Sequence, residues 1–149
     1  MPIGEICSRE VIVVRRSDSV LEAAKLMRRH HVGDVVVVDE RDGIRVPVGL
    51  VTDRDVVVEI IATEIDPGVI TVEDIMEPDL ACARDSTGIF ETIQYMQDRK
   101  VRRLPIVDER GALLGILSLD DLLELLSEEL LAMAKLVRYQ QQTETRFRQ

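Results

Sequence analysis

Hydrophobic and polar positions in the first half of the chain predict one short β-α-β-β-α unit. Three apolar runs are typical of buried strands, and a segment with helical spacing of apolar residues lies between the first two. That segment opens on Ser19-Val20-Leu21-Glu22, a capping-box pattern for a helix start. Asp42-Gly43 is a turn signal. The apolar face of the first helix is expected to carry Val20, Leu21, Ala24 and Met27. We expect strands at 11–14, 35–38 and 48–51 and helices at 19–31 and 53–62.

The second half of the chain repeats this pattern. The segment 32–39 aligns with 101–108 at an offset of 69 residues, and after a shorter loop 49–55 aligns with 115–121 at an offset of 66. A three-stranded unit cannot bury both faces alone, so two copies are expected to pack around a pseudo-twofold axis in an α/β (α+β) fold. The expected parts are a first repeat at 1–66, a second at 67–131, and a helix extension with a polar tail at 132–149.

The closing helix of the second repeat is predicted to run from about Leu119 toward Tyr139. Its apolar stripe consists of Leu122, Leu126, Leu130, Met133 and Val137. Residues beyond about Leu131 have no counterpart in the first repeat, so they are expected to pack on a second subunit. The polar segment 140–149 is expected to be frayed or disordered.

Composition narrows the function. Hydrophobic residues make up 46% of the 149-residue chain and aromatic residues only 3%, so the core must be aliphatic and base-stacking surfaces are not expected. The net charge of −9 disfavours nonspecific binding to nucleic acid. No apolar run approaches the roughly 20 residues of a membrane span. Cys7 and Cys82 are too far apart to suggest a metal site or a disulfide framework, which is typical of a cytoplasmic protein.

The pattern Gly-x-x-[Ser/Thr]-x-x-Asp follows a predicted strand in each repeat. In one interpretation, Thr52 with Asp55 and Ser118 with Asp121 only cap the helices that they begin. In the other, the same helix start binds a ligand. Its free N–H groups suit a phosphate, its hydroxyl can bind phosphate or ribose, and its carboxylate can accept from ribose hydroxyls. The sequence leaves both interpretations open.

With these two motifs in two repeats, the chain resembles a tandem pair of cystathionine β-synthase-type (CBS) domains, a Bateman module. The resemblance covers residues 2–62 and 71–131, and its carriers are the two glycine motifs and the segment Val101 to Asp108. It implies a regulatory ligand such as AMP, ADP, ATP or S-adenosylmethionine in two clefts between the repeats, with no cofactor required. It also implies dimerisation through helices.

Mapped residue by residue, the resemblance implies two unequal clefts. The favoured first cleft would contain Leu50, Thr52, Asp55, Leu80, Ala81, Arg102 and Arg103. The second would contain Val11, Ile12, Val32, Gly33, Asp34, Ile116, Ser118 and Asp121. Where the first cleft has Arg103, the second has Asp34, which would repel a phosphate. Phosphorylated ligands are therefore expected in the first cleft.

The sequence favours a stand-alone sensor of an adenosine-containing ligand that signals in trans, through a dimer surface, to an effector protein or enzyme. The alternative is a structural or protein-interaction module whose motifs serve only as helix caps. An enzyme is not expected, because no triad, metal cluster or paired acid and base is evident. His30-His31 is interpreted as a solvated helix end rather than a metal site.

Overall fold

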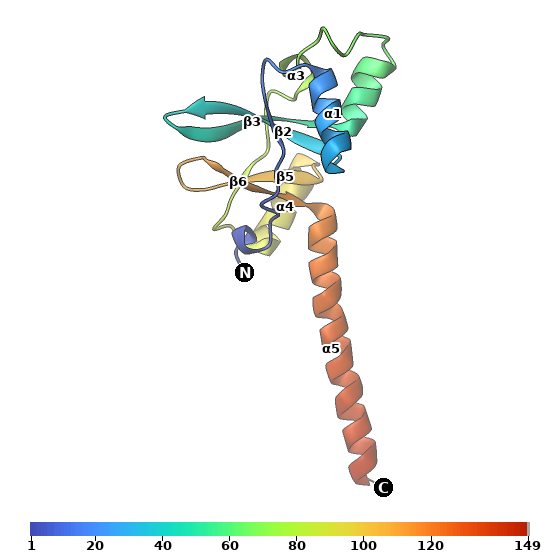
Figure 1. Cartoon of the computed structure of the whole chain (residues 1–149). Coiled ribbons are helices and arrows are strands. Elements are labelled where there is room, and N and C mark those ends of the chain that lie inside the picture. Colours follow the sequence, from blue (N-terminus) through green and yellow to red (C-terminus); the bar gives the residue numbers. More distant parts are fainter. Residues whose placement is uncertain (149) are drawn as a thin grey trace. The chain divides into compact units, whose positions relative to one another are not determined.

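The protein, described by a computed structural model over residues 1–148, forms two compact units, Met1–Leu117 and the part from Ser118 onward (Figure 1). The elements in chain order are η1 (Ile3–Glu5), β1 (Val13–Arg15), α1 (Val20–His30), β2 (Asp34–Arg41), β3 (Ile44–Thr52), α2 (Asp53–Asp55), η2 (Val56–Ile61), α3 (Val72–Ile75), β4 (Ala83–Arg84), α4 (Ile89–Arg99), β5 (Arg103–Val107), β6 (Leu113–Ser118) and α5 (Leu119–Arg148).

The strands form two small sheets in the orders β1-β2-β3 and β4-β5-β6. In the first sheet, β1 is parallel to β2 and β2 is antiparallel to β3. The hairpin between β2 and β3 turns at Asp42 and Gly43, whose φ angles of 51° and 78° are both positive, as a two-residue type I′ turn requires. The predicted mixed fold and the turn signal are confirmed.

The repeat seen in the sequence is present in the structure. Helices α1 and α4 each contain 11 residues. Each is capped by the residue that follows it, which has the left-handed conformation, His31 with φ 54° after α1 and Lys100 with φ 56° after α4. Strand β2 begins at Asp34 and β5 at the aligned Arg103. The alignment therefore places equivalent residues at equivalent points of the two repeats.

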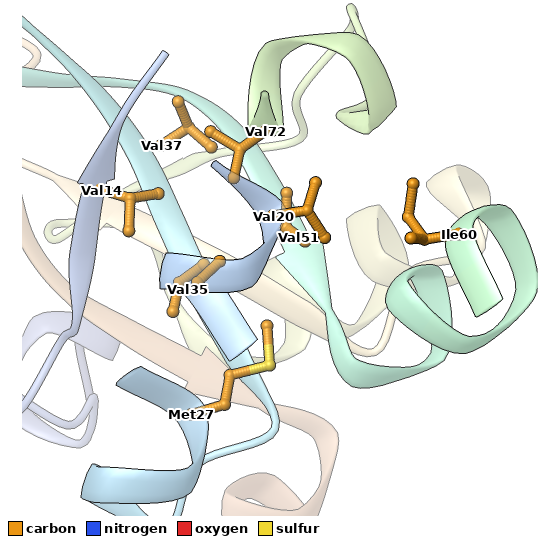
Figure 2. Packing of buried hydrophobic residues seen from close by; sticks show 9 residues of the cluster. Val14, Val20, Met27, Val35, Val37, Val51, Ile60 and Val72 are labelled. Carbon is orange, nitrogen blue, oxygen red and sulfur yellow. The ribbon is translucent and has the colours of Figure 1, made fainter. Parts of the chain in front are cut away.

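Aliphatic side chains fill the core of the first repeat, as the scarcity of aromatic residues predicted. Val35 and Val37 of β2 and Val51 of β3 are fully buried between α1, η2 and α3 (Figure 2). The buried face of α1 differs from the expected one. It carries Val20, Ala23 and Met27, whereas Leu21 is exposed, because a residue one step along a helix points about 100° away.

The segment that begins each repeat packs on the other repeat. Near the N-terminus, the N–H of Ile3 donates to the carbonyl of Thr87 at 2.8 Å. In the aligned segment of the second repeat, the N–H of Val72 donates to the carbonyl of Asp18 at 2.9 Å. Ile3 and Val72 are both fully buried. The two repeats are therefore interlocked, a feature that the domain boundaries drawn from the sequence do not convey.

The second helix of the first repeat is not a regular α-helix. One α-helical turn, α2, is followed by the π-helical segment η2, in which the N–H of Ala62 donates to the carbonyl of Val57 at 2.9 Å. Val56, Val57 and Val58 are three consecutive β-branched residues, which crowd the preceding turn of an α-helix. The widened turn leaves Ile60 buried and exposes Val57 and Val58.

Helix α5 is a single helix of 30 residues. The expectation of a frayed tail from residue 140 is wrong as far as Arg148, and residue 149 lies outside the described residues. The segment contains no glycine or proline, and its Gln, Arg and Glu residues are good helix formers. No helix among the described residues is both long and apolar enough to cross a membrane.

Candidate functional site

The first unit contains a pocket of about 300 Å³ where the end of β3 meets two segments of the second repeat. Its lining residues are Leu50, Thr52, Asp55, Glu77, Asp79, Leu80, Ala81, Lys100, Val101, Arg102 and Arg103. All seven residues that the sequence assigned to the first cleft are among them. Three segments that are distant in sequence thus converge on one cavity of a size that small-molecule sites have.

Thr52 and Asp55 form a complete capping box at the edge of this pocket. The hydroxyl oxygen of Thr52 accepts from the N–H of Asp55 at 3.2 Å, and Oδ2 of Asp55 accepts from the N–H of Thr52 at 2.9 Å. The capping interpretation is therefore correct for these residues. Capping leaves hydrogen-bonding capacity for a ligand, because the Thr52 hydroxyl can still donate and Oδ1 of Asp55 can still accept.

Three basic residues contribute positive charge to the pocket. Lys100 ends α4 in the left-handed conformation, and Arg102 and Arg103 follow it at the start of β5. Nε of Arg103 lies 2.7 Å from Oδ2 of Asp34, the first residue of β2, in an ion pair between the two repeats. Both side chains are partly buried, which strengthens their mutual attraction.

The pairing of Arg103 with Asp34 is a feature that the sequence reasoning missed. Arg103 and Asp34 were expected in different clefts, whereas the structure places them in direct contact. Burial raises the pKa of Asp34 and the charge of Asp53 raises it further, while the charge of Arg103 lowers it. A side chain added at Gly33 would lie 3.2 Å from a carboxylate oxygen of Asp53 and 3.5 Å from Nη2 of Arg103. The carboxylate of Asp53 therefore lies in the neighbourhood of the ion pair between Asp34 and Arg103.

Two acidic residues in the lining were also missed. Glu77 and Asp79 precede the predicted Leu80 and Ala81, and Asp79 forms an ion pair with Arg99 at 3.2 Å. The sequence signal was the run Glu77-Pro78-Asp79 next to the apolar pair. The pocket is therefore less basic than the two arginines alone suggested.

The second cleft stays a prediction. Ser118 and Asp121 form the same reciprocal capping bonds, at 3.1 and 3.2 Å, at the start of α5. They belong to the unit that begins at Ser118. The other predicted members belong to the first unit and are Val11, Ile12, Val32, Gly33, Asp34 and Ile116.

Other candidate chemistry among residues 1–148 is sparse. No group of three His, Cys, Asp or Glu side chains in this part of the chain could hold a metal ion. His31 is exposed at the end of α1. Burial raises the pKa of the Cys82 thiol to about 11, which keeps it protonated and unreactive at neutral pH.

Comparisons with known proteins agree with this architecture. The family described as CBS domain matches residues 3–62 and again residues 72–128. An uncharacterised protein of Methanopyrus kandleri is 34% identical over 82% of this chain and 61% of its own length. The inosine-5′-monophosphate dehydrogenase of Methanocaldococcus jannaschii is 34% identical over 80% of this chain and 22% of its own length. The chain thus spans less than two thirds of either relative.

Solved structures show the same fold. An uncharacterised conserved protein from Pyrococcus horikoshii aligns with a TM-score of 0.72 and 33% identity, over 83% of this chain and 89% of that one. A CBS domain pair crystallised with 5′-methylthioadenosine and S-adenosylmethionine aligns with a TM-score of 0.75 and 23% identity, over 87% and 98% of the two chains. With both repeats matched, the chain belongs to the CBS domain family as a tandem pair.

Proposed function

We propose that the chain is a cytoplasmic regulatory module that senses an adenosine-containing ligand in the pocket at the end of β3. The observation that supports the proposal most directly is the convergence of Thr52, Asp55 and three basic residues on one cavity, the basic residues being Lys100, Arg102 and Arg103. Membership of the CBS domain family favours a regulatory role over a catalytic one. In this proposal the ligand is AMP, ADP, ATP, S-adenosylmethionine or a close derivative, and no cofactor is needed.

The chemistry of the lining suits a nucleoside. Oδ1 of Asp55 can accept from ribose hydroxyls, and the Thr52 hydroxyl can donate to a ribose or phosphate oxygen. The apolar side chains of Leu50, Leu80 and Ala81 offer a surface for a planar base. The 23% identical domain pair shares only the fold, and its two ligands supply compounds to test on this chain.

The test is a calorimetric titration of the whole chain with adenosine, 5′-methylthioadenosine, S-adenosylmethionine, AMP and ATP. We expect at least one compound to bind and the Asp55→Ala variant to bind it about tenfold or more weakly, because a hydrogen bond to a charged group contributes roughly 1.5–3 kcal/mol. The readout is the dissociation constant of each compound for wild type and variant.

The matched control is Asp74→Ala. Asp74 caps α3 by accepting from both the N–H and the hydroxyl of Thr71, at 3.1 and 3.0 Å, and it does not line the pocket. We expect this variant to lose a helix cap of similar strength, about 1 kcal/mol, and to keep its ligand affinity. Failure of every compound to bind, or equal loss in both variants, would support the alternative, an interaction module whose motifs are only caps.

We also propose that α5 mediates self-association and presents a dimer surface to an effector protein. Leu130, Met133 and Val137 are each more than half exposed, and with Leu126 they recur at intervals of four, three and four residues. That spacing is typical of a helix that packs on a second helix. Five of the six acidic residues of α5 lie in its first half, at 120, 121, 124, 128 and 129, and all four of its basic residues lie in the second half, at 135, 138, 146 and 148.

This charge distribution suits a second copy of the same helix. Two α5 helices that run in opposite directions would bring the acidic half of each next to the basic half of the other, and their dipoles would oppose favourably.

A further inference from the structure

The charges around the pocket are balanced. Its lining contains three acidic residues, Asp55, Glu77 and Asp79, and three basic residues, Lys100, Arg102 and Arg103. Asp34 and Arg99, which form ion pairs with the lining residues Arg103 and Asp79, add one charge of each sign. A site built for a triphosphate needs an excess of positive charge to offset the ligand's own charges. The described groups around this pocket provide none.

Arg103, one of the three basic residues of the lining, is already engaged in an ion pair. Asp34 holds Nε of Arg103 at 2.7 Å, with 19% of the Asp34 side chain and 34% of the Arg103 side chain exposed. An ion pair at this depth is weakly screened, so its carboxylate cancels most of the guanidinium's field at the pocket. The carboxylate of Asp53 and the guanidinium of Arg103 both border the space next to Gly33, so a second negative charge lies in this neighbourhood.

We propose that the pocket binds an adenosine compound of little net charge, either a nucleoside or a nucleoside with a zwitterionic substituent, in preference to a nucleoside triphosphate. Asp34 sets this preference as a positioning residue, because it holds and neutralises Arg103. The inference rests on the proposed function and deepens it by naming the class of ligand.

The energetic reason is Coulombic. A polyphosphate in the pocket would face the carboxylates of Asp55, Glu77 and Asp79, and it could use Arg103 fully only by displacing Asp34. Displacement would leave a partly buried carboxylate without its partner, which is unfavourable. A neutral nucleoside can instead use Oδ1 of Asp55 and the apolar lining without disturbing the ion pair.

The test compares the affinities of the whole chain for 5′-methylthioadenosine and for ATP without magnesium, at one fixed low ionic strength. We expect wild type to bind the thioether nucleoside about tenfold or more tightly than ATP. In Asp34→Asn, which keeps the shape of the side chain and removes its charge, we expect this ratio to fall by about tenfold. Adding Arg103→Gln to Asp34→Asn should restore the wild-type ratio. ATP binds Asp34→Asn more tightly through the released guanidinium of Arg103, and the second substitution removes that group.

Asp39→Asn is the matched control. Asp39 lies on the same strand, loses the same charge and is also ion-paired, with Nε of Arg16 at 2.8 Å, but it does not line the pocket. We expect it to leave the ratio unchanged. Equal affinities in wild type, or an unchanged ratio in Asp34→Asn, would overturn the inference while leaving the adenosine site in place. If none of adenosine, 5′-methylthioadenosine, S-adenosylmethionine, AMP and ATP binds wild type, the proposed function itself fails and the inference fails with it.

Discussion

Replacing Gly115 with alanine is expected to lower the free energy of unfolding by about 3 kcal/mol, at the upper end of what overpacking a core normally costs. The added β-carbon would collide with the carbonyl oxygen of Ser8 and lie 2.8 Å from Sγ of Cys7. Gly115 is the glycine of the second Gly-x-x-[Ser/Thr]-x-x-Asp motif, so this collision gives a physical reason for a glycine at that position.

The backbone at Ser8 has little freedom to move away. Its N–H donates to the carbonyl of Ile116 at 2.9 Å, and the N–H of Ile116 donates back to the carbonyl of Ser8 at 2.9 Å. An alanine at Gly115 must break or stretch this pair of hydrogen bonds, which attaches the N-terminal segment to β6.

Gly49, the aligned glycine of the first motif, is the matched comparison. The three atoms nearest to an added β-carbon there belong to the side chain of Met76, whose sulfur and γ-carbon can move away by a change of rotamer. We therefore expect Gly49→Ala to cost about 1 kcal/mol. Urea unfolding of the two variants beside wild type measures the difference, and equal losses would show that the N-terminal segment yields more easily than its hydrogen bonds indicate.

Local patterns in the sequence predicted much of this fold. Strand runs, helix-start signatures and the Asp42-Gly43 turn each depend on neighbouring residues, and the structure has the corresponding elements. The internal repeat went further, because aligned residues occupy equivalent places in the two copies. That alignment, with the family resemblance, was enough to name seven residues that line one pocket.

Features that depend on contacts between distant segments were not predicted. The sequence named Arg103 and Asp34 as aligned residues, and alignment by a pseudo-twofold axis says nothing about whether such residues touch. The packing of the first segment of each repeat on the other repeat was not predicted for a similar reason, because no local pattern shows which repeat such a segment contacts.

The exposed apolar face of α5 was inferred from the sequence by comparing the closing helices of the two repeats. The stripe from Leu122 to Val137 predicted a buried face, and the first repeat offers no equivalent of its second half. In the structure Leu122 is buried, whereas Leu130, Met133 and Val137 are exposed. An apolar stripe that is buried at its start and exposed further along one helix supports two different contacts. The first part packs within the chain, and the second part is available to a partner.

The substitution Leu130→Glu is expected to convert a self-associated form of the protein into monomers. In a symmetric dimer each substitution occurs twice, so two carboxylates would have to be buried or the helices would have to separate. We expect the dimer dissociation constant to rise by about 100-fold or more. Analytical ultracentrifugation over a range of concentrations measures the effect.

Leu131→Glu provides the control, because Leu131 is the same residue type and is similarly exposed but lies off the face that carries Leu130, Met133 and Val137. We expect this variant to associate as wild type does. Raising the ionic strength should weaken wild-type association moderately if the acidic and basic halves of α5 face each other, since salt screens exposed charges. The proposal that α5 mediates self-association would be contradicted by a wild type that is monomeric at all concentrations, or by equal dissociation of the two variants. The exposed valines of η2 would then be the next candidate surface.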